Sequence, residues 1–290
     1  MQPGFVYLRS LVLLGALTAI MRKFVNLSLR RDVGIARERG GEYWKSERFS
    51  YLLDGWSGSD TEASKLEHSL SMLAPPLVPI YAVIYSLFAF DMIMAMDPVF
   101  FSNLFGGFVF IGNIYGAWAV VALWAFYVRR EDPSMKEMIG RQQFHDLGKL
   151  TFGFAILWAY LFFSQFLPIW YGNMPEETQW LILRTRENPW RIVSWITFSL
   201  CFITPFVVLL SRDVKRVPWT LAFAACIVLL GLWLERYVLI MPEISPHAVP
   251  FGFLEIALFV GFGGLYALTV CSFMEKYPPV AIGDPAVYGD

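Results

Sequence analysis

The sequence predicts an all-α integral membrane protein, a bundle of about seven transmembrane helices. Hydrophobic residues make up 57% of the 290 residues and charged residues only 16%, whereas soluble domains carry about 25% charged residues. The mean hydropathy is +0.51. Apolar residues gather in stretches that can cross about 30 Å of hydrocarbon, roughly 17–25 residues each. These stretches lack the alternation typical of a transmembrane barrel.

The predicted transmembrane segments belong to one helical domain over residues 1–290. They cover residues 5–21, 73–96, 101–127, 147–170, 191–210, 218–240 and 251–273. The first has no basic region before it and is followed by Arg22 and Lys23, so it is a membrane span and not a cleaved signal peptide. The polar residues 22–69 are expected to form a cytoplasmic loop.

The distribution of lysine and arginine predicts the orientation. Segments 22–69, 128–146 and 211–217 carry nine, four and three Lys or Arg residues, whereas 97–100 and 241–250 carry none and 171–190 carries two. Basic loops remain in the cytoplasm. The N-terminus is therefore expected outside and the C-terminus in the cytoplasm.

Charge and cysteine usage exclude several functions. The net charge of −1 provides no basic field for nucleic acid. The cysteines stand singly within predicted spans, without a CxxC or CxxCH motif: Cys201, Cys226 and Cys271. The histidines fall in loops or at helix ends: His68, His145 and His247. We therefore expect neither a metal centre nor a covalently bound cofactor in this chain.

Polar residues of four predicted helices fall in the same, outer half of the membrane. They are Asp91, Glu235, Glu255 and Gln165. Ionisable groups in hydrocarbon are costly and mark function or a buried partner. Burial favours the protonated form of a carboxylic acid, so Asp91, Glu235 and Glu255 are candidates for proton transfer. The alternative is that these side chains reach interfacial water.

Arg236 follows Glu235 directly. Neighbouring residues on a helix diverge by about 100°, so we expect the two side chains not to pair face to face. The hypothesis is that Arg236 reaches an acid elsewhere, such as Asp91, Glu255 or Glu176. An interfacial anchor is the alternative interpretation.

A stripe at helical spacing enters the membrane from the predicted cytoplasmic side. His145, Lys149, Tyr160 and Ser164 lie within about a third of the helix circumference. Such a stripe of titratable and hydroxyl groups is suited to carrying protons. Equally, His145 and Lys149 can decorate a solvated helix end while the hydroxyl groups bond to a neighbouring helix.

The stretch "FFSQFLPIWYGNMPEET", residues 162–178, interrupts an apolar span near its outer end. Pro168 removes one backbone donor, which is tolerated in a membrane where protein or a polar cavity supplies a partner. The residues expected to form a docking surface or the wall of a site are Gln165, Trp170, Tyr171, Asn173, Glu176 and Glu177. The aromatic residues also suit an interfacial belt.

Several motifs carry a family resemblance. "HDLGKLTFGFAILWAYLFFSQFLPIWYGNMPEET", "LLSRDVKRVP", "LERYVLIMPE" and "PPVAIGDP" resemble the ActF membrane subunit of alternative complex III, a quinol:cytochrome c oxidoreductase. That subunit belongs to the NrfD-type, polysulfide-reductase membrane-anchor family. The similarity runs from Ser69 to Asp284 and loosely includes the first span.

The resemblance implies a membrane subunit without its own redox centre in the bacterial cytoplasmic membrane. Its implied partners are subunits with iron–sulfur clusters and c-type haems, a related membrane subunit and the lipid itself. Quinol is the implied ligand, close to the outer surface and bound either by this chain or by the related membrane subunit. The candidate residues for a quinol-proximal or docking role are Gln165, Trp170, Tyr171, Asn173, Glu176, Glu177 and Arg236. The family's subunit is similar to a ten-helix protein, so further helices would precede Met1. Two alternatives stay open, a purely structural anchor and, with less support, a secondary transporter.

Overall fold

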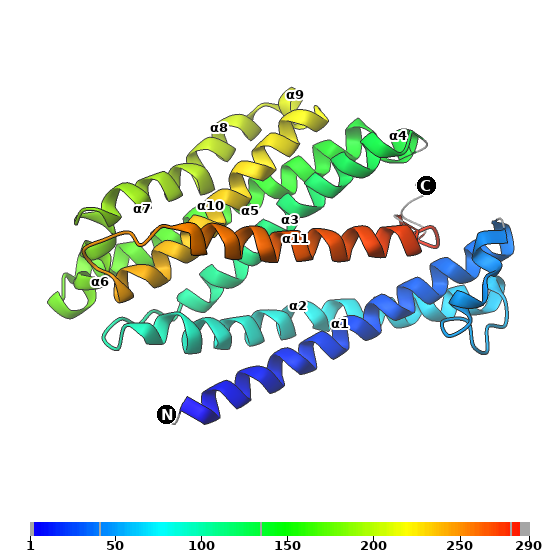
Figure 1. The fold of residues 1–290 in the computed structure, drawn as a ribbon, viewed down its shortest axis with the longest axis horizontal. Helices are drawn as coiled ribbons and strands as arrows, with labels where there is room; N and C mark the ends of the chain where they lie inside the picture. The colour runs from blue at the N-terminus through cyan, green and yellow to red at the C-terminus, as the bar shows by residue number, and fades with distance from the viewer. Residues whose placement is uncertain (1–2, 41, 134, 279, 285–290) are drawn as a thin grey trace. The chain divides into compact units, whose positions relative to one another are not determined.

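The computed structural model describes residues 3–40, 42–133, 135–278 and 280–284 (Figure 1). Every regular element in this part of the chain is a helix. Seven helical segments are long and apolar enough to cross a membrane. The protein is therefore an all-α, multi-pass membrane protein, and the predicted fold class is confirmed.

The membrane-spanning helices are α1 (Pro3–Arg39), α2 (Ser59–Met92), α3 (Phe105–Glu131), α5 (Arg141–Gly172), α7 (Trp190–Phe198) with η4 (Ser199–Ile203) and α8 (Thr204–Leu210), α10 (Pro218–Ile244) and α11 (Phe253–Lys276). The short elements are η1 (Glu42–Lys45), η2 (Glu47–Phe49), η3 (Met94–Met96), α4 (Met135–Met138), α6 (Pro175–Thr185) and α9 (Arg212–Lys215). The element η4 is a π-helical turn that joins α7 to α8.

Much of segment 22–69, expected as a loop, is helical. It contains the second half of α1, the turns η1 and η2 and the first residues of α2. At about 1.5 Å per residue, α1 with its 37 residues extends well beyond about 30 Å of hydrocarbon. The span predicted from hydropathy stops at the first charged residues. The helix itself continues into water, because its backbone hydrogen bonds continue to form.

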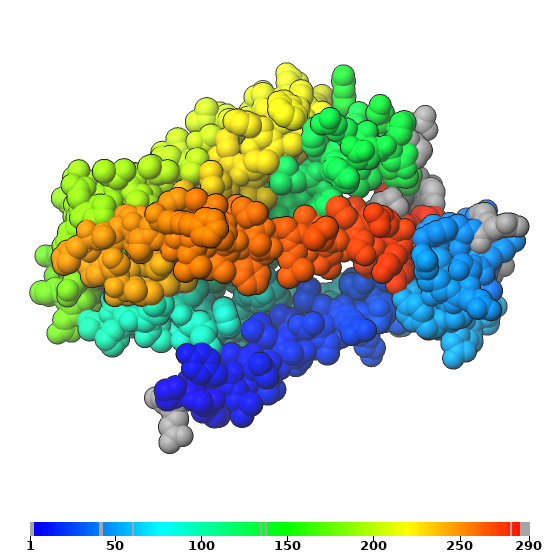
Figure 2. All heavy atoms as spheres, viewed as in Figure 1, coloured from blue at the N-terminus to red at the C-terminus, as the bar shows by residue number. Residues whose placement is uncertain are grey.

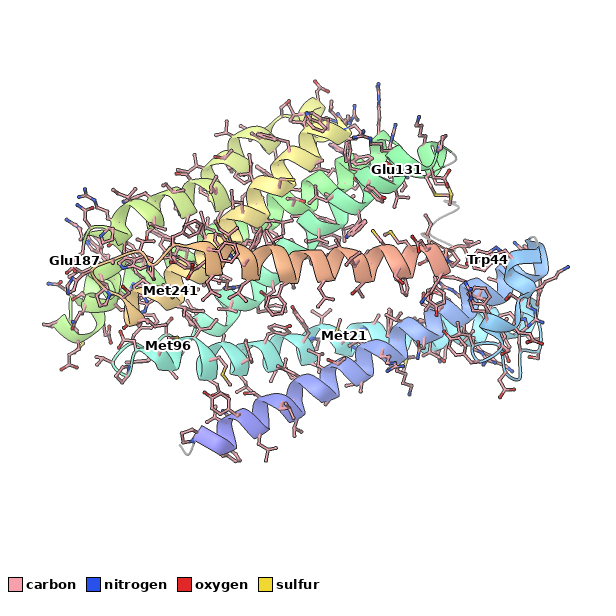
Figure 3. All side chains as sticks on the ribbon, viewed as in Figure 1. Met21, Trp44, Met96, Glu131, Glu187 and Met241 are labelled. Carbon is pink, nitrogen blue, oxygen red and sulfur yellow. The ribbon has the colours of Figure 1, made fainter. Side chains whose placement is uncertain are left out.

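Where the sequence predicts one domain, the contacts divide the chain into two compact units. Unit 1 comprises the chain up to Ile84 together with the chain from Phe251, and unit 2 comprises Tyr85–Pro250. In unit 2, Met96, Glu187 and Met241 lie at one end and Glu131 at the other (Figure 3). The connections of unit 2 therefore alternate between two ends, as the basic-residue pattern requires.

Unit 1 has a small apolar core beside the second half of α1. Its buried residues are Leu29, Val33, Phe49, Leu52 and Leu53, with Trp44, Trp56 and Tyr277 packed against them.

The segment after α11 is tied to this core by hydrogen bonds. The hydroxyl groups of Tyr51 and Tyr277 lie 2.5 Å apart, and the Gly283 N–H donates to Asp32 Oδ1 at 3.0 Å. Burial, followed by the hydrogen bond to Tyr51, raises the pKa of Tyr277 to about 12. By contrast, α11, drawn as orange to red spheres in Figure 2, has no buried residue.

In unit 2, α10 packs against α3 and against the α7–η4–α8 segment. Small residues allow close approach of membrane helices. At Gly231 a Cβ atom would lie 2.9 Å from the backbone nitrogen of Cys201. This glycine is therefore required for α10 to pass beside η4.

A proline and a tyrosine lie beside a buried carbonyl of η4. Pro205 has no N–H, so it cannot make the α-helical hydrogen bond to the carbonyl of Cys201, four residues earlier. The buried hydroxyl of Tyr115 on α3 donates to that carbonyl at 3.0 Å. The interhelical hydrogen bond thus satisfies a backbone group that the proline exposes.

Substitution Tyr115→Phe is expected to lower the free energy of unfolding by about 1–3 kcal/mol, because the buried carbonyl then loses its donor. Denaturant unfolding of the purified chain in detergent measures this effect. Tyr127→Phe, an exposed tyrosine on the same helix, is the matched control and is expected to change stability by less than about 0.5 kcal/mol. Equal effects of the two substitutions would contradict the assignment.

Candidate functional site

Unit 2 encloses a small cavity with aromatic walls. The cavity has a volume of about 80 Å³ and is lined by residues of α3, α5, α6, α7 and α10. Its aromatic wall includes Phe105, Phe108, Trp158, Phe162, Phe166 and Phe198. The rings of Trp158 and Phe162 are parallel within 5°, with centroids 6.0 Å apart. One turn apart on α5, these rings present flat faces on the same side of the helix.

Glu235 is the acidic residue in the cavity wall. It lies on α10 and is only 3% exposed. The indole Nε1–H of Trp158 donates to Glu235 Oε1 at 3.3 Å. Glu235 Oε2 lies 3.2 Å from Arg236 Nη1, but the angles of this contact do not make a hydrogen bond, and Oε2 has no other donor among the described residues. One carboxylate oxygen is therefore held by charge attraction alone.

The expectation that Arg236 cannot pair with Glu235 is wrong. The guanidinium folds back to its neighbour, and its Nη2–H donates to Asn113 Oδ1 at 3.0 Å and to the Val109 carbonyl at 3.2 Å. Two features explain the error. The arginine stem is long enough to span the 100° between neighbouring positions, and α3 approaches closely at Gly112, where a Cβ atom would lie 3.2 Å from Arg236 Nη2.

These contacts take the place of the hypothesised partners of Arg236. Its described ion pair is with Glu235, and its hydrogen bonds go to α3; within unit 2, neither Asp91 nor Glu176 is among these partners. The guanidinium therefore neutralises the buried carboxylate locally and ties α10 to α3.

Arg184 closes the cavity at the end nearest α6. Its side chain is buried, and Nε–H donates to the Val238 carbonyl at 3.1 Å. That carbonyl lacks a helical donor because Pro242, four residues later, has no N–H. A further Nη2–H bond reaches Glu243 Oε1 at 3.0 Å. Burial lowers the pKa of Arg184 to about 10, so the guanidinium remains charged at neutral pH.

The same guanidinium stacks on an aromatic pair. Its carbon lies 4.0 Å from the ring centroid of Trp180, and Trp180 stacks on Phe100 with centroids 4.0 Å apart. Cation–π contacts of this kind are stronger when the cation is desolvated. Arg184 thus joins α6, α10 and the segment before α3 into one rigid wall.

A larger depression of about 820 Å³ adjoins the cavity between α5 and α7. The two spaces share five lining residues: Phe162, Phe166, Thr185, Ser194 and Phe198. Tyr160, Phe163 and Trp195 line the outer part of the depression. This apolar, aromatic depression therefore adjoins the cavity that has Glu235 in its wall.

Glu235 and Gln165 are brought together, because both line the cavity. The Gln165 amide donates to the Leu161 carbonyl on its own helix at 3.3 Å. Asp91 is half-buried in the last turn of α2, within unit 2. Glu255 belongs to unit 1, where its carboxylate accepts the Gly252 N–H at 2.8 Å and caps α11.

The stripe on α5 divides into different environments. His145 is buried, with Nδ1 3.8 Å from Asp146 Oδ1. Lys149 is exposed and forms an ion pair with the same oxygen at 2.7 Å. Tyr160 is exposed beside the larger depression. Only Tyr160 of these three lies near the candidate site.

The end of α5 has local structural explanations for its polar residues. Asn173 adopts a left-handed conformation with φ of 45° and ends the helix, a role in which asparagine is common. Glu176 and Glu177 occupy the first turn of α6, where negative charge is favourable to the helix dipole. Trp170 and Tyr171 are exposed, as an interfacial belt or a docking surface requires.

Three residues around the cavity are not predicted from the sequence: Trp158, Arg184 and Asn113. Trp158 sits in an apolar run, where an indole is unremarkable by itself. The proline four residues after Val238 is the one available signal for Arg184, because it predicts a carbonyl in need of a donor. A search of protein-family models finds no match to this chain, and a search of curated proteins finds none either.

Proposed function

We propose that this chain is a membrane subunit of a quinol:cytochrome c oxidoreductase in the bacterial cytoplasmic membrane. It contributes a quinol-proximal site and a proton acceptor, while partner subunits with iron–sulfur clusters and c-type haems carry the electrons. The observation that supports this most is the buried Glu235 in the wall of an aromatic cavity that adjoins a larger depression. The resemblance of the "WAYLFFSQFLPIWYGNMPEET" block to ActF-type subunits agrees with it.

The volumes support the larger depression as the place of the quinol ring. A cavity of about 150 Å³ accommodates benzene, so the inner cavity of about 80 Å³ is too small for a substituted quinol ring. The depression of about 820 Å³ is large enough. This proposal puts the ring in the depression between α5 and α7, beside the inner cavity that has Glu235 in its wall.

Quinol oxidation releases two electrons and two protons. The electrons leave to the partner subunits. One of the two protons passes from a ring hydroxyl to a carboxylate oxygen of Glu235, and the other is released to water on the outer side. The attraction of Arg236 keeps the Glu235 carboxylate available as the acceptor. Trp158 orients the carboxylate through its hydrogen bond, and the aromatic walls exclude bulk water.

A purely structural anchor for redox subunits is the second candidate function. The observation in its favour is α11, an apolar helix of 24 residues with no buried residue, which is available to neighbouring membrane subunits. Copurification with haem-bearing proteins is expected for both functions, and quinone binding is expected only for the first.

Labelling with a photoreactive quinone analogue distinguishes the quinol site from the purely structural anchor. In the assembled complex, labelled peptides are expected from α5 and α7, and excess quinol is expected to protect them. Ala159→Phe places a ring in the depression and is expected to reduce labelling strongly, whereas Leu157→Phe, at an exposed position on the same helix that does not line the depression, leaves it intact. Labelling confined to other subunits would refute the quinol site and favour the anchor.

A further inference from the structure

Unit 1 has a basic depression of about 450 Å³ on the surface of α1. The residues of α1 that line it are Ala19, Arg22, Lys23, Asn26, Leu27 and Arg30. These positions recur every three or four residues, so they form one stripe along the helix. Tyr51 and Leu52 close the depression on the side of the following segment.

Two of its three cations are free to bind an anion. Arg30 is already committed: its Nη1–H groups donate to the carbonyls of Leu52 and Asp54 at 3.1 and 2.9 Å, and its Nη2 pairs with Glu62 at 3.0 Å. Arg22 and Lys23 are exposed and have no ion-pair partner among the described residues. The depression therefore has two positive charges, those of Arg22 and Lys23, that no described acidic side chain neutralises.

The depression lies where the apolar part of α1 ends. The predicted span 5–21 stops immediately before Arg22, so the two free cations stand at the depth of the lipid headgroups. On the hydrocarbon side, the same stripe of α1 continues through Val12, Gly15, Ala16 and Ala19, all exposed. Beside Gly15 a Cβ atom would meet nothing within 4 Å, so the helix surface there has room for a chain.

We propose that this depression binds an anionic phospholipid. The phosphate and the glycerol of the headgroup contact Arg22, Lys23 and Asn26, and one acyl chain follows the small-residue stripe from Ala19 toward Val12. Juxtamembrane cations attract anionic lipid by about 1 kcal/mol each. The continuous apolar stripe is the reason for a lipid in preference to a soluble anion. This site is independent of the quinol site in unit 2.

The test compares lipids and variants with the purified full chain in detergent. Native mass spectrometry measures the phospholipid retained during titration with phosphatidylglycerol or phosphatidylcholine. The unmodified protein is expected to prefer phosphatidylglycerol. The double variant Arg22→Gln/Lys23→Gln is expected to bind phosphatidylglycerol about 30-fold more weakly, from about 1 kcal/mol per cation.

Arg37→Gln/Arg39→Gln is the matched control, because it removes the same charge from the same helix. Its residues lie about 22 Å further along the axis, beyond the screening length of about 8 Å, and we expect less than about a twofold effect. Equal loss in both double variants would overturn the site, as would equal affinity for the two lipids. Displacement of the lipid by millimolar inorganic phosphate would also overturn it, since the site would then recognise the anion alone. Circular dichroism verifies that each variant keeps its helices.

Discussion

Glu235→Gln is expected to lower the quinol oxidation rate of the assembled complex by about 100-fold or more. Proton transfer to a positioned base contributes about 10²–10⁴-fold to a rate, and glutamine cannot accept the proton. The amide keeps the size of the side chain and can still accept the bond from Trp158, which reaches Oε1 at 3.3 Å. The protein should therefore fold and assemble. Steady-state quinol oxidation and proton release are the measurements.

Two further variants show whether the loss of quinol oxidation is specific to the Glu235 carboxylate. Glu187→Gln, at an exposed position, is the matched control and is expected to leave the rate unchanged. Asp91→Asn tests the other acid of unit 2 that the sequence marks as a candidate for proton transfer. An unchanged rate in Glu235→Gln would remove the proposed proton acceptor, and an unchanged rate in Asp91→Asn as well would reduce both acids to structural groups.

Arg184→Met is expected to have the largest effect on stability. Removing one partner of a buried ion pair costs about 3–5 kcal/mol. The Glu243 side chain is 21% exposed, so water relieves part of its unpaired charge and we expect about 3 kcal/mol. The substitution also strips the donor from the Val238 carbonyl. Denaturant unfolding in detergent, monitored by tryptophan fluorescence, measures the loss.

Two further variants test whether the loss of stability in Arg184→Met comes from the contacts of Arg184 with its neighbours. Arg191→Met removes an exposed arginine nearby and is expected to change the free energy of unfolding by less than about 0.5 kcal/mol. Glu243→Gln combined with Arg184→Met is expected to be less destabilised than the sum of the two single variants, since the pair couples. Additive effects would show that Arg184 acts without Glu243.

The sequence predicts where the membrane spans lie, but it does not predict the residues at which every helix ends. The predicted span 218–240 begins at the first residue of α10, Pro218, because an apolar run and a helix-initiating proline coincide there. For α1 the prediction stops at residue 21, while the helix continues to Arg39. Hydropathy detects the lipid boundary, and backbone hydrogen bonding decides where the helix ends.

For the candidate site, the sequence predicts that Glu235 lies deep in the membrane, but it does not predict which side chains contact one another. Glu235 is recognisable because an acid deep in an apolar run is costly. Its contact with Trp158 joins positions 77 residues apart, and the Arg184–Glu243 pair joins positions 59 apart. Helical periodicity describes one helix at a time, so it cannot show which helices meet. The Glu235–Arg236 ion pair does not follow from the angle between neighbouring helical positions, because the length of the arginine side chain also decides what it reaches.

Infrared difference spectroscopy of the assembled complex during quinol oxidation measures most directly whether Glu235 takes up a proton. The expected result is a carboxylic-acid carbonyl band that appears as quinol is oxidised and is absent from the Glu235→Gln variant, with the Glu187→Gln spectrum unchanged. A difference spectrum that is the same with and without the Glu235 carboxyl group would contradict the proposal that this buried side chain is the proton acceptor.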